Sequence, residues 1–250
     1  MQYRFKAQYV DAFHAAKHEQ ALGTVHTVSL AEYRPPFLDK VGQWNKFNRY
    51  SGGTLVEKCC HYFDLMNLAA GSSPARVFAS GGQAVNFLDF EQDGERSDID
   101  DHAFVTVEYE NGVRGSFTLN MFCQELFEEM VIAGEKGRLV ARETASFSPG
   151  TRSSASLQVE VPKHPLSEPA TIGYPEQVEA SGHYGATYFE HEAFLNTLEG
   201  EPADGATARQ GFQAMLLASA AQHSMKTAGP VDIPGYAQDR GVADLLATDS

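Results

Sequence analysis

The stretch Ser51–Asn67, SGGTLVEKCCHYFDLMN, decides how this chain is organised. Two glycines break the preceding loop, and an apolar pattern with helical spacing begins directly after them. The apolar positions, at i, i+4, i+7, i+8 and i+11, are Leu55, Cys59, Tyr62, Phe63 and Met66. One face of the segment is therefore apolar, and we predict a packed helix from Gly53 to about Ala70.

A polar face of the same helix carries Glu57 and His61, which are four residues apart. A carboxylate beside an imidazole can orient the ring and favour its protonated form, so the pair is a candidate acid–base site. The same spacing also describes an ordinary ion pair on a solvated helix face. Adjacent helical positions diverge by about 100°, so Lys58 is predicted to point away from the pair.

The composition is that of an acidic globular protein. The 250 residues carry 33 acidic and 19 basic side chains, a formal net charge of −14. This charge argues against a nucleic-acid partner and against binding to anionic membranes. No apolar run approaches the ~20 residues of a membrane helix. The adjacent Cys59 and Cys60 cannot form an ordinary disulfide, so we expect a reduced, cytoplasmic protein with both thiols packed in the core.

Alternating apolar residues predict a sheet after the first helices. Asn111-Gly112 and the segment Gly134–Gly137 are hairpin signals. The predicted strands are Thr24–Arg34, Arg76–Ser80, Ala103–Tyr109, Val113–Phe122, Glu129–Ala133, Arg138–Arg142, Ser156–Val161 and an edge strand at Val231–Ile233. Further helices are predicted over residues 7–22, with Val10 and Phe13 on one face, and over about 185–199 and 206–227. The fold class is therefore α+β, a largely antiparallel open β-sheet with helices packed on one face.

Three connecting segments stand out. The loop Phe37–Ser51 is long and holds the only tryptophan, which is typical of a functional loop. Residues 144–156 and 162–183 are rich in Ser, Pro and Gly, and we interpret the second as a surface excursion or lid. The tail beyond Gly235 is predicted to be poorly ordered.

Neither nucleotide-binding glycine fingerprint occurs in the chain, so Gly52-Gly53 is interpreted as a tight turn rather than a phosphate cradle. Glu57 and His61 could offer two metal ligands, but zinc would need a third from elsewhere. We expect no metal site, and a metal-assisted hydrolase or isomerase is the weakest of the alternatives.

The pieces around this helix resemble the C-terminal domain of the Gfo/Idh/MocA oxidoreductases, named for glucose–fructose oxidoreductase and inositol dehydrogenase. The family pattern is a Trp, a short spacer, Gly-Gly and a helix of the form L-x-D-x-x-x-H-x-x-D. Here it is Trp44, Gly52-Gly53, Leu55, Glu57, His61 and Asp64. The segment VIAGEKGRL at Val131–Leu139 and the pattern YFEHEAFLNTLEGEP…GFQAMLLASAAQHSMKTAGPV also match. The resemblance covers about residues 3–233.

This resemblance implies a substrate that is a sugar, a cyclitol or a related polyol, and NAD or NADP as cofactor, bound mainly by an N-terminal Rossmann domain. A lysine of that domain would act together with the helix motif. His61 takes the position of the catalytic histidine, and Glu57 takes that of the aspartate, one methylene longer. Further substrate contacts are expected from the loops, at Arg34, Lys40, Trp44, Asn45, His183 and Tyr184.

We expect residues 1–235 to form this domain, residues 236–250 a tail, and the dinucleotide-binding domain to be absent from the chain. We also expect a homo-oligomer that forms through the open sheet face. The alternative to a catalytic domain is a non-catalytic binding or oligomerisation module derived from the same family.

Overall fold

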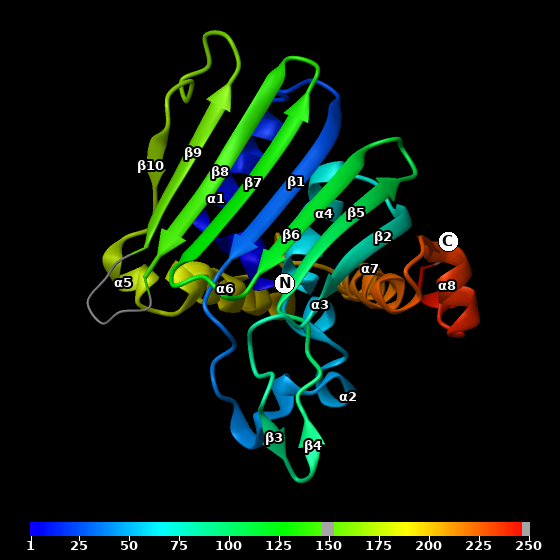
Figure 1. Ribbon diagram of the computed structural model, residues 1–250. Helices are drawn as coiled ribbons and strands as arrows, with labels where there is room; N and C mark the ends of the chain where they lie inside the picture. The colour runs from blue at the N-terminus through cyan, green and yellow to red at the C-terminus, as the bar shows by residue number, and fades with distance from the viewer. Residues whose placement is uncertain (147–152, 247–250) are drawn as a thin grey trace.

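The centre of the computed structural model, which describes residues 1–146 and 153–246, is an open nine-stranded sheet (Figure 1). The strand order is β10-β9-β8-β7-β1-β6-β5-β2-β11. The strands are β1 Val25–Tyr33, β2 Pro74–Gly82, β5 His102–Tyr109, β6 Arg114–Asn120, β7 Leu126–Gly134, β8 Gly137–Ala145, β9 Ser154–Glu160, β10 Ala170–Ile172 and β11 Val231–Asp232. All neighbouring pairs are antiparallel except β1 with β6, so the predicted α+β class with a largely antiparallel sheet is confirmed.

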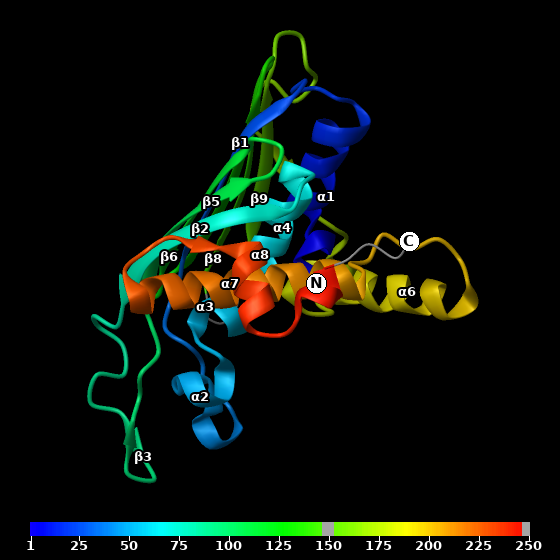
Figure 2. The ribbon, with the colours of Figure 1, turned by 90° about the vertical axis from the view of Figure 1, so that its right-hand side faces the viewer.

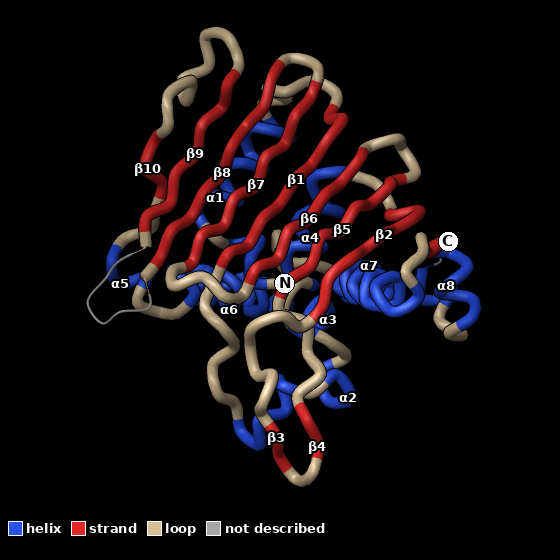
Figure 3. The backbone as a smooth tube through the Cα atoms, viewed as in Figure 1, coloured by secondary structure: helices blue, strands red, loops and turns tan. Residues whose placement is uncertain are grey.

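Helices cover one face of this sheet, and the other face is open (Figures 1 and 2). The α-helices are α1 Ala7–Phe13, α2 Asn48–Ser51, α3 Thr54–Glu57, α4 Cys60–Ala70, α5 Glu176–Glu179, α6 Ala186–Glu199, α7 Ala208–Thr227 and α8 Ile233–Asp239. Shorter 3-10 or π turns are η1 Gln2–Phe5, η2 His14–His18, η3 Val41–Lys46, η4 His183–Gly185 and η5 Ala243–Leu246. An arm containing α2 and the ribbon β3 Glu91–Gln92 with β4 Glu95–Arg96 extends away from the sheet (Figure 3).

The predicted hairpins are confirmed, because β5 pairs with β6 around Asn111-Gly112 and β7 pairs with β8 around Glu135-Lys136. Strand β1 enters between these hairpins and pairs with both β6 and β7. Residues 162–183, the predicted lid, include β10 and α5. Part of the Ser-rich segment 144–156 lies outside the described residues.

Two predicted boundaries are wrong. The helix predicted over residues 7–22 ends at His18, because the Leu22 carbonyl accepts the amide of Lys136 and the chain turns to meet the β7–β8 hairpin. Val10 is 41% exposed rather than packed beside Phe13. The tail predicted to be disordered beyond Gly235 continues α8, whose first turn is capped by the Asp232 carboxylate.

The helix predicted from Gly53 to Ala70 is broken into α3 and α4. Its apolar stripe is buried as predicted, and so are Cys59 and Cys60. The break falls at Lys58 and Cys59, where Cys59 adopts ψ near −6° and helical hydrogen bonding is interrupted. This break changes which side chains share a face.

The start of α3 is held by a contact with α7. Gly53 has φ of +102°, and a Cβ atom there would lie 2.7 Å from the side chain of Gln222. Gln222 is buried and its amide donates to the Asp100 carboxylate, so it has little room to move. Gly52-Gly53 therefore faces the helix α7, which supports its interpretation as a turn.

Substituting Gly53 with alanine should destabilise the fold by about 3 kcal/mol, because positive φ strain and a collision with Gln222 add together. Gly112 has φ of +90° with open space around it, so Gly112→Ala should cost only about 1 kcal/mol. Urea denaturation of both variants measures the difference. Equal losses would show that Gln222 does not restrain this turn.

Candidate functional site

A cavity of about 630 Å³ opens on the helix side of the sheet, between the α3–α4 break and the segment 179–184. Six predicted site residues line it: Arg34, Lys40, Glu57, His61, His183 and Tyr184. Its size lies within the range of about 300–1,000 Å³ that small-molecule sites occupy. The structure thus brings together residues that are up to 150 positions apart in the sequence.

Two predicted contacts are not among the residues that line this cavity. Asn45 is buried, and its amide donates to the Leu38 carbonyl at 3.0 Å, so it braces the loop. Trp44 lies on η3 at the surface. The geometry gives neither residue a role in the cavity.

Beneath the cavity, three glutamates form a row across neighbouring strands. Glu32 of β1 lies opposite Glu128 of β7, which lies opposite Glu143 of β8. All three carboxylates are at most 1% exposed. Like charges directly opposite one another destabilise a sheet, so this row requires compensation from the helices.

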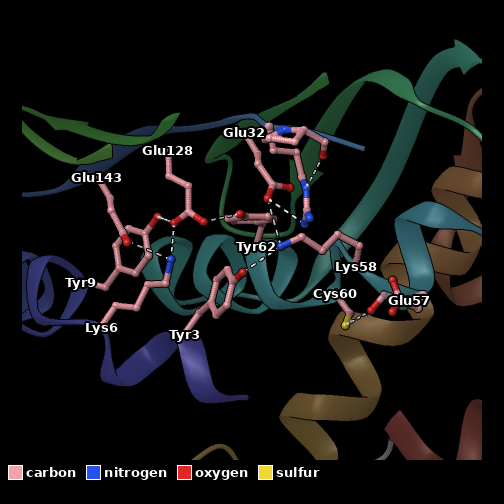
Figure 4. Close-up of polar contacts among 12 residues, drawn as sticks. Tyr3, Lys6, Tyr9, Glu32, Glu57, Lys58, Cys60, Tyr62, Glu128 and Glu143 are labelled. Carbon is pink, nitrogen blue, oxygen red and sulfur yellow. Dashed lines mark hydrogen bonds and ion pairs between the residues drawn. The ribbon is translucent and has the colours of Figure 1, made fainter. Parts of the chain in front are cut away.

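Lys6 supplies the first compensating charge (Figure 4). Its Nζ lies 2.7 Å from Glu128 Oε2 and 2.9 Å from Glu143 Oε2. Burial lowers the pKa of Lys6, but the two carboxylates outweigh burial and raise that pKa well above its ordinary value. The pKa of Glu143 is raised, mainly by burial, whereas Lys6 holds the pKa of Glu128 below its usual range against the effect of burial.

Lys58 supplies the second charge, and the prediction that it points away from the site is wrong. Its Nζ lies 3.0 Å from Glu32 Oε1 and donates to the Tyr3 hydroxyl at 2.8 Å (Figure 4). Lys58 lies at the break between α3 and α4, and its side chain reaches the sheet on the side of Glu32. Burial lowers the pKa of Lys58, but Glu32 outweighs it, so the ammonium stays charged.

His61 sits beside these cations. Its ring stacks on Tyr3 at 4.8 Å between centroids, and Tyr3 is positioned by η1, whose Arg4 pairs with Asp64 of α4 at 2.6 Å. Burial, then the charge of Lys58, lowers the pKa of His61 to about 3. The imidazole is therefore neutral, which contradicts the expectation that Glu57 favours its protonated form.

Glu57 and His61 share the cavity without a hydrogen bond between them among the described residues. Glu57 Oε2, His61 Nδ1 and Glu32 Oε2 are all buried atoms that have no hydrogen-bond partner within the described chain. Burial raises the pKa of Glu57, although Lys58, Lys40 and Arg34 lower it in part. Three unsatisfied polar atoms at one cavity are a strong indication of a ligand that donates hydrogen bonds.

Sequence reasoning missed five residues of the site: Tyr3, Lys6, Glu32, Lys58 and Glu128. One signal was available, since Glu32 and Glu128 occupy the inward-facing register of otherwise apolar strands. A carboxylate at such a position is rarely left unpaired. Its lysine partners come from distant segments, and strand pattern alone could not identify them.

A family model matches residues 18–233 of the chain. It describes the C-terminal alpha/beta domain of the Gfo/Idh/MocA oxidoreductase family. The chain belongs to this family. It is 25% identical over 215 residues to the uncharacterized oxidoreductase YrbE of Bacillus subtilis (strain 168), covering 85% of this chain and 56% of YrbE. The chain thus spans little more than half the length of this curated relative.

Solved structures share the fold of this Gfo/Idh/MocA domain. A levoglucosan dehydrogenase in complex with NADH matches with a TM-score of 0.67 and 17% identity, over 93% of this chain and 64% of the other. An aldose-aldose oxidoreductase from Caulobacter crescentus, complexed with glycerol, matches with a TM-score of 0.62 and 16% identity, over 92% and 62%. At these identities the likeness concerns the fold.

No helix among residues 1–146 and 153–246 is long and apolar enough to cross a membrane. Within the same residues, no three His, Cys, Asp or Glu side chains gather as a metal site.

The low pKa of His61 makes stability depend on pH. The unfolded imidazole, with its ordinary pKa of 6.5, binds a proton below that pH, whereas the folded one does not until about pH 3. The contribution of His61 to the free energy of unfolding is therefore present above pH 6.5. It is lost as pH falls, by about 2 kcal/mol between pH 7 and pH 5. Urea denaturation should show a drop larger by this amount in the wild type than in His61→Gln. Equal drops in the free energy of unfolding for the two proteins, or an NMR titration midpoint near 6.5 for His61, would contradict the low pKa of this residue.

Substituting Lys6 should show how much the buried glutamate row destabilises the fold when it lacks a counter-charge. We expect Lys6→Met to lower the free energy of unfolding by about 3–5 kcal/mol, because Glu128 and Glu143 lose their shared counter-charge. Adding Glu143→Gln to that variant should recover part of the loss. Lys136→Met, a surface control in the β7–β8 hairpin, should change stability by less than about 0.5 kcal/mol. If Lys6→Met behaves like that control, the row is not held by Lys6.

Proposed function

We propose that this chain is the substrate-binding and catalytic domain of an NAD(P)-dependent oxidoreductase that acts on a hydroxyl of a sugar, cyclitol or related polyol. The observation that carries the proposal is the set of unpartnered buried atoms at the cavity, Glu32 Oε2, Glu57 Oε2 and His61 Nδ1. Neighbouring hydroxyls of a polyol would donate to all three at once. The levoglucosan dehydrogenase structures contain NADH and, in one case, L-sorbose, which is consistent with this class of ligand.

His61 is the proton acceptor in this proposal. Its imidazole is neutral, so it can accept the proton of the reacting hydroxyl, and its stacking on Tyr3 fixes the ring. Glu57 accepts a hydrogen bond from a second hydroxyl and so orients the substrate. The fixed ammonium of Lys58 favours the negative charge that develops on the oxygen as its proton leaves. A nicotinamide bound next to the cavity would supply the acceptor for the hydride.

The described residues do not fit a dinucleotide, so we propose that the cofactor is bound mainly outside these 250 residues. At the glycine pair that precedes α3, the side chain of Gln222 fills the space beside Gly53, so this turn cannot cradle a phosphate. Helix α6, which packs on η1 and η4 beside the cavity, exposes Tyr188, Phe194, Leu195 and Leu198. An apolar helix face of this kind suits a neighbouring domain.

The open sheet face favours a second role in assembly. Phe104 is 62% exposed there, and Phe78 and Tyr33 also point away from the helices. We propose that this face pairs with a second copy of the chain, since these exposed aromatic side chains stand among charged ones on an uncovered antiparallel sheet and would be buried by such pairing. If the domain served only for such assembly, substitutions in the cavity would leave the association of its copies unchanged.

Turnover tests the catalytic proposal. Assayed with its dinucleotide-binding half and NAD or NADP, His61→Ala should lower kcat at least about 100-fold while thermal stability is kept. His14, which is exposed on η2 away from the cavity, offers the matched control His14→Ala, which should keep wild-type turnover. Production of NADH or NADPH is followed by absorbance. Unchanged turnover in His61→Ala would remove His61 from the mechanism.

A further inference from the structure

Arg34 brings a preorganised cation to the cavity. Its backbone extends the sheet, with its amide donating to Asn120 at 2.8 Å and its carbonyl accepting from Cys123 at 3.0 Å. The side chain is 13% exposed, packs over Phe37, and donates from Nε to the Pro35 carbonyl at 3.0 Å. The guanidinium is thus fixed in place before any ligand arrives.

The outer nitrogens of this guanidinium are held only loosely. Nη1 forms an ion pair with Glu32 Oε1 at 3.6 Å, a distance too long for a hydrogen bond. Lys40 also lines the cavity, and its Nζ makes no ion pair or hydrogen bond within the described chain. A nearly buried guanidinium with free donors, next to an unpaired ammonium, is arranged for an anion.

The other charges of the cavity do not satisfy these two cations. Lys6 balances Glu128 and Glu143, and Glu32 is shared between Lys58 at 3.0 Å and Arg34 at 3.6 Å. Glu179 belongs to the lid, where its carboxylate accepts the backbone amide of Tyr174. Glu57 also lies near Arg34 and Lys40, and no ion pair within the described residues joins it to either. The three cations Lys58, Arg34 and Lys40 thus share the two carboxylates Glu32 and Glu57.

We propose that the substrate of this site is an anionic sugar or polyol, whose carboxylate or phosphate binds Arg34 and Lys40 while its hydroxyls reach Glu57 and His61. This inference depends on the proposed function, because it names the chemical class of the same substrate. Arg34 and Lys40 then determine specificity, and neutral sugars of the same shape leave both cations unpaired.

The geometry also indicates how strongly the two residues should discriminate. Hydrogen bonds to charged groups contribute more than neutral ones, and Arg34 loses little freedom because it is already held by Pro35 and Phe37. We expect the anionic ligand to bind about 10- to 100-fold more tightly than its neutral counterpart. Lys40 is exposed, so its share should weaken with salt.

Calorimetric titration of the intact protein with two matched pairs tests this: D-glucuronate against D-glucose, and myo-inositol 1-phosphate against myo-inositol. At about 50 mM salt, the anionic member of a pair should bind at least about tenfold more tightly. Arg34→Gln and Lys40→Gln should each reduce that ratio, and the double variant should bring it close to one. Arg76→Gln, which removes an exposed arginine on the open sheet face, should leave the ratio unchanged.

The outcomes separate the two proposals. If both members of each pair bind equally well, the anionic substrate is excluded and the polyol site stands. If no member binds, the proposed function fails together with this inference. A preference for glucuronate alone identifies a carboxylate, and a preference for the inositol phosphate alone identifies a phosphate. If circular dichroism shows that Arg34→Gln folds poorly, the exposed Lys40→Gln still tests the proposal. An unchanged ratio of anionic to neutral affinity in Lys40→Gln overturns the role of Lys40 and with it the proposed pair.

Discussion

The row of buried glutamates Glu32, Glu128 and Glu143 is the constraint on which the rest of this structure depends. Three carboxylates in register on adjacent strands repel one another, and each would be costly to bury alone. The fold tolerates them because lysines from two separate helical segments reach the same face of the sheet. The N-terminal segment and the α3–α4 break are thus tied to the sheet by charge as well as by apolar packing.

This compensation explains why the cavity lies where it does. Lys58 lies at the break between α3 and α4 and reaches Glu32, and Glu57 and His61, which lie on the two sides of the break, make no hydrogen bond to one another within the described chain. Tyr3 occupies the space between Lys58 and His61 and contacts both. A cavity lined by charged and aromatic side chains therefore lies over an ionic floor, and the apolar core fills most of the remaining helix side of the sheet.

Local sequence patterns predicted much of this fold. The hairpins at Asn111-Gly112 and Gly134–Gly137 and the buried stripe that begins at Leu55 depend on neighbours in the sequence, and all three are confirmed. The ion pair of Lys58 was missed because its partner, Glu32, lies on a distant strand. Candidate residues of the cavity were predicted through a family resemblance, yet Trp44 was placed by the same reasoning and lies outside it. Patterns within one element therefore predict packing, but they do not predict which elements a buried charge will recruit.

The ionic floor also determines the protonation state of the cavity above it. The ammonium groups that neutralise the glutamates lie close enough to His61 to disfavour its protonated form, in addition to the effect of burial. A carboxylate row held by fixed lysines thus keeps a neutral imidazole beside it, and the basicity of this imidazole is lower than that of a free histidine. The charges that allow the sheet to fold around buried glutamates are in this way the same charges that hold His61 in the neutral form, which accepts a hydrogen bond from a hydroxyl group.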